Sequence, residues 1–310
     1  MVKIDLITGF LGSGKTTFIK KYAKYLIDQG VNIGILENDY GAVNVDMMLL
    51  KDLEGENCEL EMIAGGCDAD CHRRRFRTKL IAMGMCGYDR VIVEPSGIYD
   101  VDEFFDVLRD DPIDRWYEIG NVITVVDVKL EPEMSDEADY LLASEAANAG
   151  CIVLSRSQEA SEKEIENTIA HLNHAMEKVQ CKRRFKDEIV VKDWSAFDDA
   201  DYERLLSCGY VLENYRKMHI EEGETFKSLY FMNLDKTKEE IAEAAENVLE
   251  DKDCGKVFRV KGFLKDEDGK WMELNATHQE MRLERITEGQ EVVIVIGEAL
   301  NEEKIEEYFS

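Results

Sequence analysis

The chain has 310 residues, of which 45% are hydrophobic, and its formal net charge is -28 because 66 acidic residues outnumber 38 Lys and Arg. This length allows one large core or two unequal ones, and so negative a field repels phosphate backbones and anionic lipids. We therefore do not expect nucleic acid as the main partner. The N-terminus lacks the basic region and long apolar stretch of a signal peptide, and no apolar run approaches the roughly 20 residues of a membrane span. We expect a cytoplasmic protein without membrane contact.

Predicted strands and helices alternate over the first two thirds of the chain. An apolar strand at 2–7, a helix at 14–29 and a β-branched strand at 31–36 form one βαβ unit. Further elements follow in the same rhythm: buried strands at 90–94, 121–127, 151–154 and 188–191, and a helix at 161–179. This alternation predicts an α/β domain with a doubly wound, mostly parallel sheet.

The rhythm changes after about residue 214. A strand at 226–232 and a helix at 236–249 precede a run of strands at 257–264, 270–274, 281–284 and 291–296 and a closing helix at 301–308. Several strands in succession after a single helix indicate a smaller α+β domain. We therefore expect two domains, 1–212 and 222–310.

The most specific motif is Gly-Phe-Leu-Gly-Ser-Gly-Lys-Thr at 9–16, a complete G-x-x-x-x-G-K-T between the first strand and the first helix. Its glycines let backbone N–H groups curl around phosphate oxygens, Lys15 reaches the β- and γ-phosphates, and the Thr16 hydroxyl binds Mg²⁺. The predicted nucleotide-binding residues here are Gly9, Gly12, Ser13, Gly14, Lys15, Thr16 and Thr17. The motif predicts a P-loop nucleotide hydrolase.

Acidic residues end several of the predicted strands. Glu94 opens Glu-Pro-Ser-Gly at 94–97, Asp127 ends its strand, and Glu37 ends the second strand. Carboxylates at the carboxyl edge of the sheet are placed to hold magnesium or to face the γ-phosphate. The alternative is a carboxylate that faces solvent or caps a helix. We predict Thr16, Glu37, Glu94 and Asp127 as magnesium ligands, Lys15, Glu37 and Glu94 as catalytic residues, and a contact from Gly97 to the γ-phosphate.

A third motif, Ala-Gly-Gly-Cys-Asp-Ala-Asp-Cys-His at 64–72, contains two of the eight cysteines. If this segment is helical, Cys67 and Cys71 lie four residues apart on one face, with Asp70 and His72 within reach. Thiolate, imidazole and carboxylate together suit Zn²⁺ or a neighbouring transition metal. The alternative is a pair of incidental reduced thiols. Cys67, Asp70 and Cys71 are the predicted ligands.

These motifs together resemble the CobW-like family of P-loop GTPases, which are relatives of the nickel-handling urease and hydrogenase accessory GTPases. The resemblance rests on segments 9–16, 37–41 with Asp46, 65–67 and 94–97, and on 257–264, which is similar to the opening strand of the family's C-terminal domain. It implies GTP and Mg²⁺ as cofactors, Zn²⁺ or Co²⁺ as the bound metal, and a client metalloprotein or cofactor-maturation protein as partner. A nucleotide-dependent dimer is a further expectation.

The chain departs from the family pattern at the cysteines. Where the family has Cys-x-Cys-Cys, this chain has Cys67, Ala69 and Asp70, with Cys71 one place further on. A site of three thiolates is therefore excluded. Two thiolates with Asp70 or His72 are the expected ligand set, which is harder and selects metals differently.

A second departure affects the base. The guanine-reading Asn-Lys-x-Asp is replaced by Ser-Arg-Ser-Gln at 155–158. The Gln158 amide has one carbonyl acceptor where a carboxylate accepts both the N1–H and N2–H of guanine, while the Arg156 guanidinium can stack on any purine. We predict that Arg156 and Gln158 contact the base and that the preference for guanine is weak.

The sequence thus predicts a nucleotide triphosphatase, using GTP, that couples hydrolysis to the delivery of a metal or metallocofactor to a client protein. Two alternatives remain open. A small-molecule kinase would use the same loop to pass the γ-phosphate to an acceptor, and a regulatory GTP-binding switch would bind its partner without metal.

Overall fold

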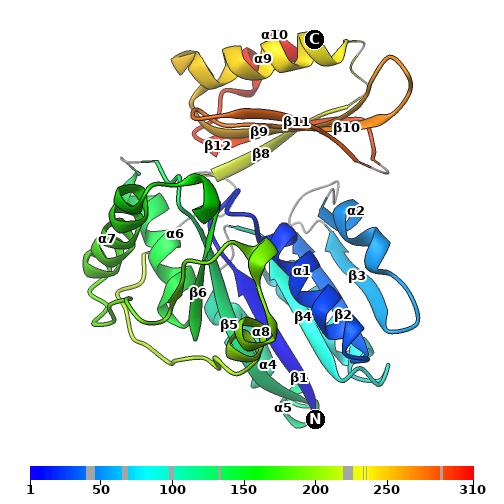
Figure 1. Ribbon diagram of the computed structural model, residues 1–310, viewed down its shortest axis with the longest axis vertical. Helices are drawn as coiled ribbons and strands as arrows, with labels where there is room; N and C mark the ends of the chain where they lie inside the picture. The colour runs from blue at the N-terminus through cyan, green and yellow to red at the C-terminus, as the bar shows by residue number, and fades with distance from the viewer. Residues whose placement is uncertain are drawn as a thin grey trace. The chain divides into compact units, whose positions relative to one another are not determined.

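The computed structural model describes residues 1–39, 46–64, 69–97, 101–131, 134–218, 226–232, 234, 236–286 and 289–310, with the backbone alone at residues 39, 64, 69 and 70. The chain divides into two compact units, Met1–His219 and Ile220–Ser310, and each unit contains its own sheet (Figure 1). The sequence analysis placed this division between 212 and 222.

The first unit is built on a sheet of seven parallel strands in the order β3-β2-β4-β1-β5-β6-β7. The strands are β1 (Val2–Thr8), β2 (Ile33–Asp39), β3 (Cys58–Ala64), β4 (Arg90–Pro95), β5 (Tyr117–Asp127), β6 (Cys151–Ser155) and β7 (Ile189–Val190). Strand β1 lies at the centre, with β4, β2 and β3 on one side and β5, β6 and β7 on the other. The loops that follow the strands of both halves therefore meet at the carboxyl edge of the sheet, beside the end of β1. The predicted doubly wound α/β sheet is confirmed.

Helices cover both faces of this sheet. They are α1 (Lys15–Asp28), α2 (Asp46–Leu50), α3 (Ala69–Met83), α4 (Val101–Leu108), α5 (Ile113–Trp116), α6 (Asp136–Ala147), α7 (Glu162–Lys178) and α8 (Asp199–Leu206), with 3-10 turns η1 (Lys51–Leu53), η2 (Ser157–Glu159) and η3 (Trp194–Ala196). Helices α1 and α8 lie on the near face (Figure 1). One buried cluster joins these two helices to the sheet: it contains Phe18 and Tyr22 of α1, Leu205 of α8, and Ile35 and Ile123 of the strands. Strand residues of the opposite face are buried as well, which defines a three-layer domain.

A buried polar network fastens α1 to the centre of the sheet. Asp5 of β1 is 0% exposed and accepts hydrogen bonds from Tyr22 Oη at 2.8 Å, Arg90 at 2.5 Å and the backbone N–H of Asn121 at 2.9 Å. The donors come from α1, β4 and β5, so one carboxylate joins three elements. Burying it is tolerated because its charge is paired and its oxygens are hydrogen-bonded.

The second unit is an antiparallel sheet in the order β11-β10-β9-β12-β8 with two helices on one face (Figure 1). Its elements are β8 (Phe226–Met232), α9 (Lys238–Glu250), η4 (Lys252–Cys254), β9 (Lys256–Lys265), β10 (Trp271–Ala276), β11 (Met281–Arg285), β12 (Val292–Glu298) and α10 (Glu302–Phe309). Ile241 of α9 and Phe309 of α10 pack with Val260 and Val295 in a separate core. The predicted α+β architecture is confirmed.

Across the described parts of both units, no helix combines the length and apolar character needed to span a bilayer.

Candidate nucleotide and metal site

The loop between β1 and α1 has a conformation that requires glycine. Gly9 has φ +147° and Gly14 has φ +96°, in the region that side chains disfavour. A Cβ at Gly9 would lie 2.2 Å from the carbonyl oxygen of Val125, so this position also has no room for a side chain. The tight turn brings the Lys15 ammonium to 2.9 Å from the Gly9 carbonyl, to which it donates a hydrogen bond. This hydrogen bond closes the loop on itself.

The other predicted loop residues lie in the same turn. Gly12 has φ +78°, Ser13 and Thr16 are buried, and Thr17 is exposed in the first turn of α1. The N-terminus of α1 supplies free backbone N–H groups and a partial positive charge at this point. The local structure suits an anion, while the contacts of each residue with a nucleotide stay predictions.

Two neighbouring carboxylates and one hydroxyl meet beside the loop. The Thr16 hydroxyl donates a 2.8 Å hydrogen bond to Glu94 Oε1, and Glu37 of β2 is the register partner of Glu94 of β4. Glu37 and Glu94 are 2% and 4% exposed. Two carboxylates buried side by side require a proton or a cation, and hard oxygen ligands of this kind suit Mg²⁺. The residues present fit a magnesium ion.

The pKa of Glu94 is set mainly by its burial. The pKa of Glu94 is raised to about 7, chiefly by burial and also by the charge of Asp46. Glu37, Lys15 and Thr16 act in the opposite direction. Burial therefore dominates, and with a pKa of about 7 the Glu94 carboxyl is partly protonated near pH 7.

The loop that follows β4 packs directly on the P-loop. A Cβ at Gly97 would lie 2.7 Å from the backbone nitrogen of Leu11, so only glycine allows this approach. The predicted contact between Gly97 and the γ-phosphate stays a prediction, and the close packing favours it.

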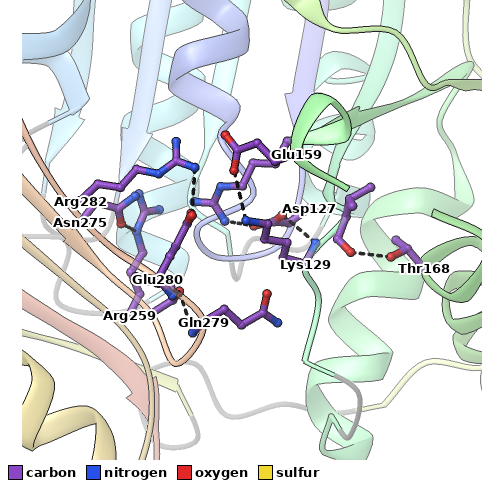
Figure 2. Close-up of polar contacts among 12 residues, drawn as sticks. Asp127, Lys129, Glu159, Thr168, Arg259, Asn275, Gln279, Glu280 and Arg282 are labelled. Carbon is purple, nitrogen blue, oxygen red and sulfur yellow. Dashed lines mark hydrogen bonds and ion pairs between the residues drawn. The ribbon is translucent and has the colours of Figure 1, made fainter. Parts of the chain in front are cut away.

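Asp127 is engaged in a different group of contacts at the end of β5. Its carboxylate accepts a hydrogen bond from the Arg156 guanidinium and one of 2.9 Å from the backbone N–H of Lys129. The Lys129 ammonium in turn pairs with Glu159 at 3.1 Å (Figure 2). The role of Asp127 as a magnesium ligand stays a prediction. These bonds favour a structural role, in which Asp127 holds together the loops that follow β5 and β6.

The two side chains predicted to contact the base are directed to protein partners. Arg156 has left-handed backbone geometry with φ 55° and forms the ion pair with Asp127. Gln158 is exposed, and its amide donates a 3.5 Å hydrogen bond to Glu159. Their contacts with the base stay predictions.

The predicted metal site falls mainly outside the described residues. Cys67 lies outside them, and Asp70 is described only by its backbone, in the first turn of α3. Cys71 is half-buried, and the next residue, His72, is fully buried. Burial lowers the pKa of His72 to about 4, aided by Arg75, so its imidazole is neutral at pH 7. Among the described residues there is no group of three or more His, Cys, Asp or Glu arranged to hold a metal.

Glu145 is a buried acid that the sequence analysis did not identify. Glu145 of α6 is 0% exposed, and neither of its carboxylate oxygens has a hydrogen-bond partner among the residues that the structure describes. Burial raises the pKa of Glu145 well above its usual value, although the charge of Lys15 lowers it. Helix α6 carries three other acids, Asp136, Glu137 and Asp139, and Glu145 belongs to no motif, so the sequence offered no signal that this carboxylate is buried.

Comparison with known proteins gives matches to two family models. The model described as "CobW/HypB/UreG, nucleotide-binding domain" matches residues 3–185, and that described as "Cobalamin synthesis protein cobW C-terminal domain" matches residues 235–310.

Curated relatives include two zinc chaperones of Escherichia coli (strain K12). YeiR is 28% identical over 158 residues, which cover 51% of this chain and 47% of YeiR. YjiA is 25% identical over 183 residues, which cover 56% of this chain and 55% of YjiA. The chain thus matches about half the length of these relatives. A crystal structure of Zn(II)-bound YjiA GTPase is 18% identical and aligns over 99% of this chain and 98% of that one, with a TM-score of 0.36.

Proposed function

Since the chain belongs to the CobW/HypB/UreG family, we propose that it is a GTP hydrolase that couples hydrolysis to the delivery of Zn²⁺ to a client protein. The observation that carries the proposal is the hydrogen bond from Thr16 to Glu94, with Glu37 beside it, at a complete P-loop. The zinc-chaperone names of YeiR and YjiA support Zn²⁺ as the cargo.

The P-loop binds the triphosphate through its backbone and through Lys15. The Lys15 ammonium donates a hydrogen bond to the Gly9 carbonyl. Phosphate oxygens are stronger acceptors than a carbonyl because they are charged. The ammonium therefore exchanges its bond to Gly9 for bonds to the β- and γ-phosphates, and the loop around it needs no refolding.

Thr16, Glu37 and Glu94 are the residues that would hold the magnesium ion. When bound, this ion neutralises charge on the phosphate oxygens. The protein contributes a dry setting, because both carboxylates are almost completely buried. It also contributes orientation, because the Thr16 bond fixes the Glu94 carboxylate toward the first turn of α1.

Strand β2 is the element that can carry the nucleotide state to the cysteines. Glu37 pairs with Glu94 of β4 on one side and with Met62 of β3 on the other. Strand β3 precedes the segment of Cys67 and Cys71 in the sequence. Hydrolysis would change the contacts of Glu37, and β3, the strand next to Glu37, leads into the cysteine segment. We propose that this connection links the presence of the γ-phosphate to the affinity for zinc.

Phosphate release from GTP in the presence of Mg²⁺ tests the hydrolase part of the proposal. Glu94→Gln keeps the shape and the bond to Thr16 but loses the charge, and we expect turnover to fall by about 10- to 100-fold. Asp28→Asn, at an exposed carboxylate of the same helix that carries Thr16, should leave turnover unchanged. Turnover that requires a second substrate would identify a kinase instead, and failure to bind zinc when loaded with GTP would favour a metal-independent switch.

A further inference from the structure

Strand β11 is the last strand of the second unit's sheet within the described residues, and β10 is its neighbour (Figure 1). Its register with β10 is unbroken from Met281 to Arg285, and these five residues include no proline and no glycine. Natural edge strands are often protected by a proline or a bulge, because their free backbone groups can pair with another strand. Strand β11 lacks both devices, so its backbone can accept a further strand.

The backbone groups of β11 alternate between β10 and the open edge. The ladder to β10 continues just beyond β11, where the Ile286 N–H donates to the Trp271 carbonyl at 3.0 Å. Bonded pairs recur at every second residue of an antiparallel ladder, so Arg282 and Glu284 are the residues of β11 that bond to β10. The N–H and C=O groups of the other three residues point away from the sheet. These residues are Met281, Leu283 and Arg285.

The open edge also carries apolar side chains. Met281 and Leu283 are 39% and 38% exposed. Leu283 is the register partner of Leu274, which is 0% exposed and belongs to the core under the helices. The apolar layer of this unit therefore continues to the edge, and a further strand would remove part of it from water.

The charges of β11 select one register for pairing between two copies of the strand. In an antiparallel pair centred on Leu283, the outward backbone groups bond to one another, and Arg282 lies opposite Glu284 of the second copy. This opposed pair is not bonded through its backbone, so its side chains approach closely. A pair centred on Arg282 would oppose two arginines, and one centred on Glu284 would oppose two glutamates. Like charges disfavour both of these registers.

We propose that β11 pairs with β11 of a second copy of this chain, antiparallel and centred on Leu283. The two Leu283 side chains then meet on one face of the joined sheet, and Arg282 meets Glu284 at two symmetry-related positions on the other face. Such an isologous contact closes as a dimer, and it joins two five-stranded sheets into one. Because each copy contributes one short strand, we expect a dissociation constant of about 1–100 µM.

Sedimentation equilibrium of the full chain tests this pairing, at protein concentrations up to about 200 µM and at about 0.15 M salt. We expect a monomer–dimer equilibrium without nucleotide, because the contact needs only the second unit. Glu284→Arg opposes two arginines at both symmetric positions, so the dissociation constant should rise by about 10-fold or more. Adding Arg282→Glu to that variant restores opposite charges and should recover the parental constant.

Leu283→Pro tests the backbone part of the contact. The Leu283 N–H points outward, so proline there leaves the ladder to β10 intact while it removes a donor from the open edge. We expect the dissociation constant to rise by about 10-fold or more. Glu306→Arg makes the same change of charge as Glu284→Arg at an exposed position of α10, and it should leave the constant unchanged. If the proline variant does not fold, the charge reversal and its rescue still decide.

Two results would overturn the inference. A parent chain that stays monomeric over the whole concentration range would leave the edge of β11 to a strand of another protein. A dimer whose dissociation constant is the same in the parent, in Glu284→Arg and in Leu283→Pro would use a different surface. Neither result bears on the proposed GTP hydrolysis, because Leu283 and Glu284 lie outside the predicted nucleotide and metal residues.

Discussion

Thr16 donates a 2.8 Å hydrogen bond to Glu94 across 78 positions of the chain. The bond links the first turn of α1 to the end of β4, and both side chains are buried. It holds a hydroxyl and a carboxylate together at the start of α1, next to the P-loop. Such preorganisation lowers the cost of assembling the magnesium site.

Replacing Lys15 tests the phosphate site. Lys15→Ala removes a charge-assisted bond to the most anionic oxygens of the nucleotide, so we expect GTP affinity measured by calorimetry to fall by about 10- to 100-fold or more. Lys24→Ala, at an exposed position of the same helix, should retain the parental affinity. Parental affinity in Lys15→Ala would place the nucleotide elsewhere.

Glu94 should make the nucleotide-free protein less stable above neutral pH. Its pKa is raised from 4.5 to about 7 by burial, so ionising it costs folding free energy that begins near pH 4.5 and is complete above about pH 7. Without Mg²⁺, Glu94→Gln should therefore unfold later than the parent at pH 8, by of the order of 1–3 kcal/mol, and the difference should vanish toward pH 4.5. Denaturant unfolding at several pH values measures it, and a pH-independent difference would contradict this assignment.

The buried network at Asp5 should dominate the stability of the first unit. Asp5→Ala leaves the Arg90 guanidinium, 10% exposed, and the Tyr22 hydroxyl without their shared acceptor. Breaking a buried pair on one side costs about 3–5 kcal/mol, which denaturant titration can detect. The control Asp28→Ala breaks an exposed pair with Lys24 and should cost no more than about 0.5 kcal/mol. Equal effects would show that the network is not a centre of stability.

The cysteine pair should hold the metal as thiolates. Cys67→Ser with Cys71→Ser replaces two soft ligands by hydroxyls, so Zn²⁺ affinity should fall steeply, and in the parent it should weaken as pH falls because the thiols take up protons. Cys86→Ser, at an exposed cysteine, serves as control in a competition assay with a chromophoric chelator. Parental affinity in the double variant would show that zinc binds elsewhere or not at all.

Much of the fold could be predicted because most buried strands are continuous apolar runs. Strand β3 was missed because Glu59 and Glu61 alternate with apolar residues, so the segment is not a continuous apolar run. Helix α6 was missed for the opposite reason. Its residues from Ala138 to Ala147 are all buried, so it has no polar stripe to reveal a helical period.

The site was predictable where chemistry fixes the spacing along the chain. The P-loop is one contiguous segment, and Glu94 and Glu37 end strands whose order brings them together. The ion pair between Arg156 and Asp127 depends on β5 and β6 being neighbours, which spacing alone does not show. The approach of Trp194 to Gly14 likewise depends on a loop that follows the last strand of the sheet.

The dependence of Zn²⁺ affinity on nucleotide state tests the central claim most directly. Titrating zinc by chelator competition into protein loaded with Mg²⁺ and either a non-hydrolysable GTP analogue or GDP gives two dissociation constants, with Lys15→Ala as the control that cannot respond. Coupling between the γ-phosphate and the cysteine segment predicts tighter zinc binding in the triphosphate state by about 10-fold or more, and no difference in the Lys15 variant. Equal zinc affinity in both states of the parent protein would contradict nucleotide-coupled metal delivery.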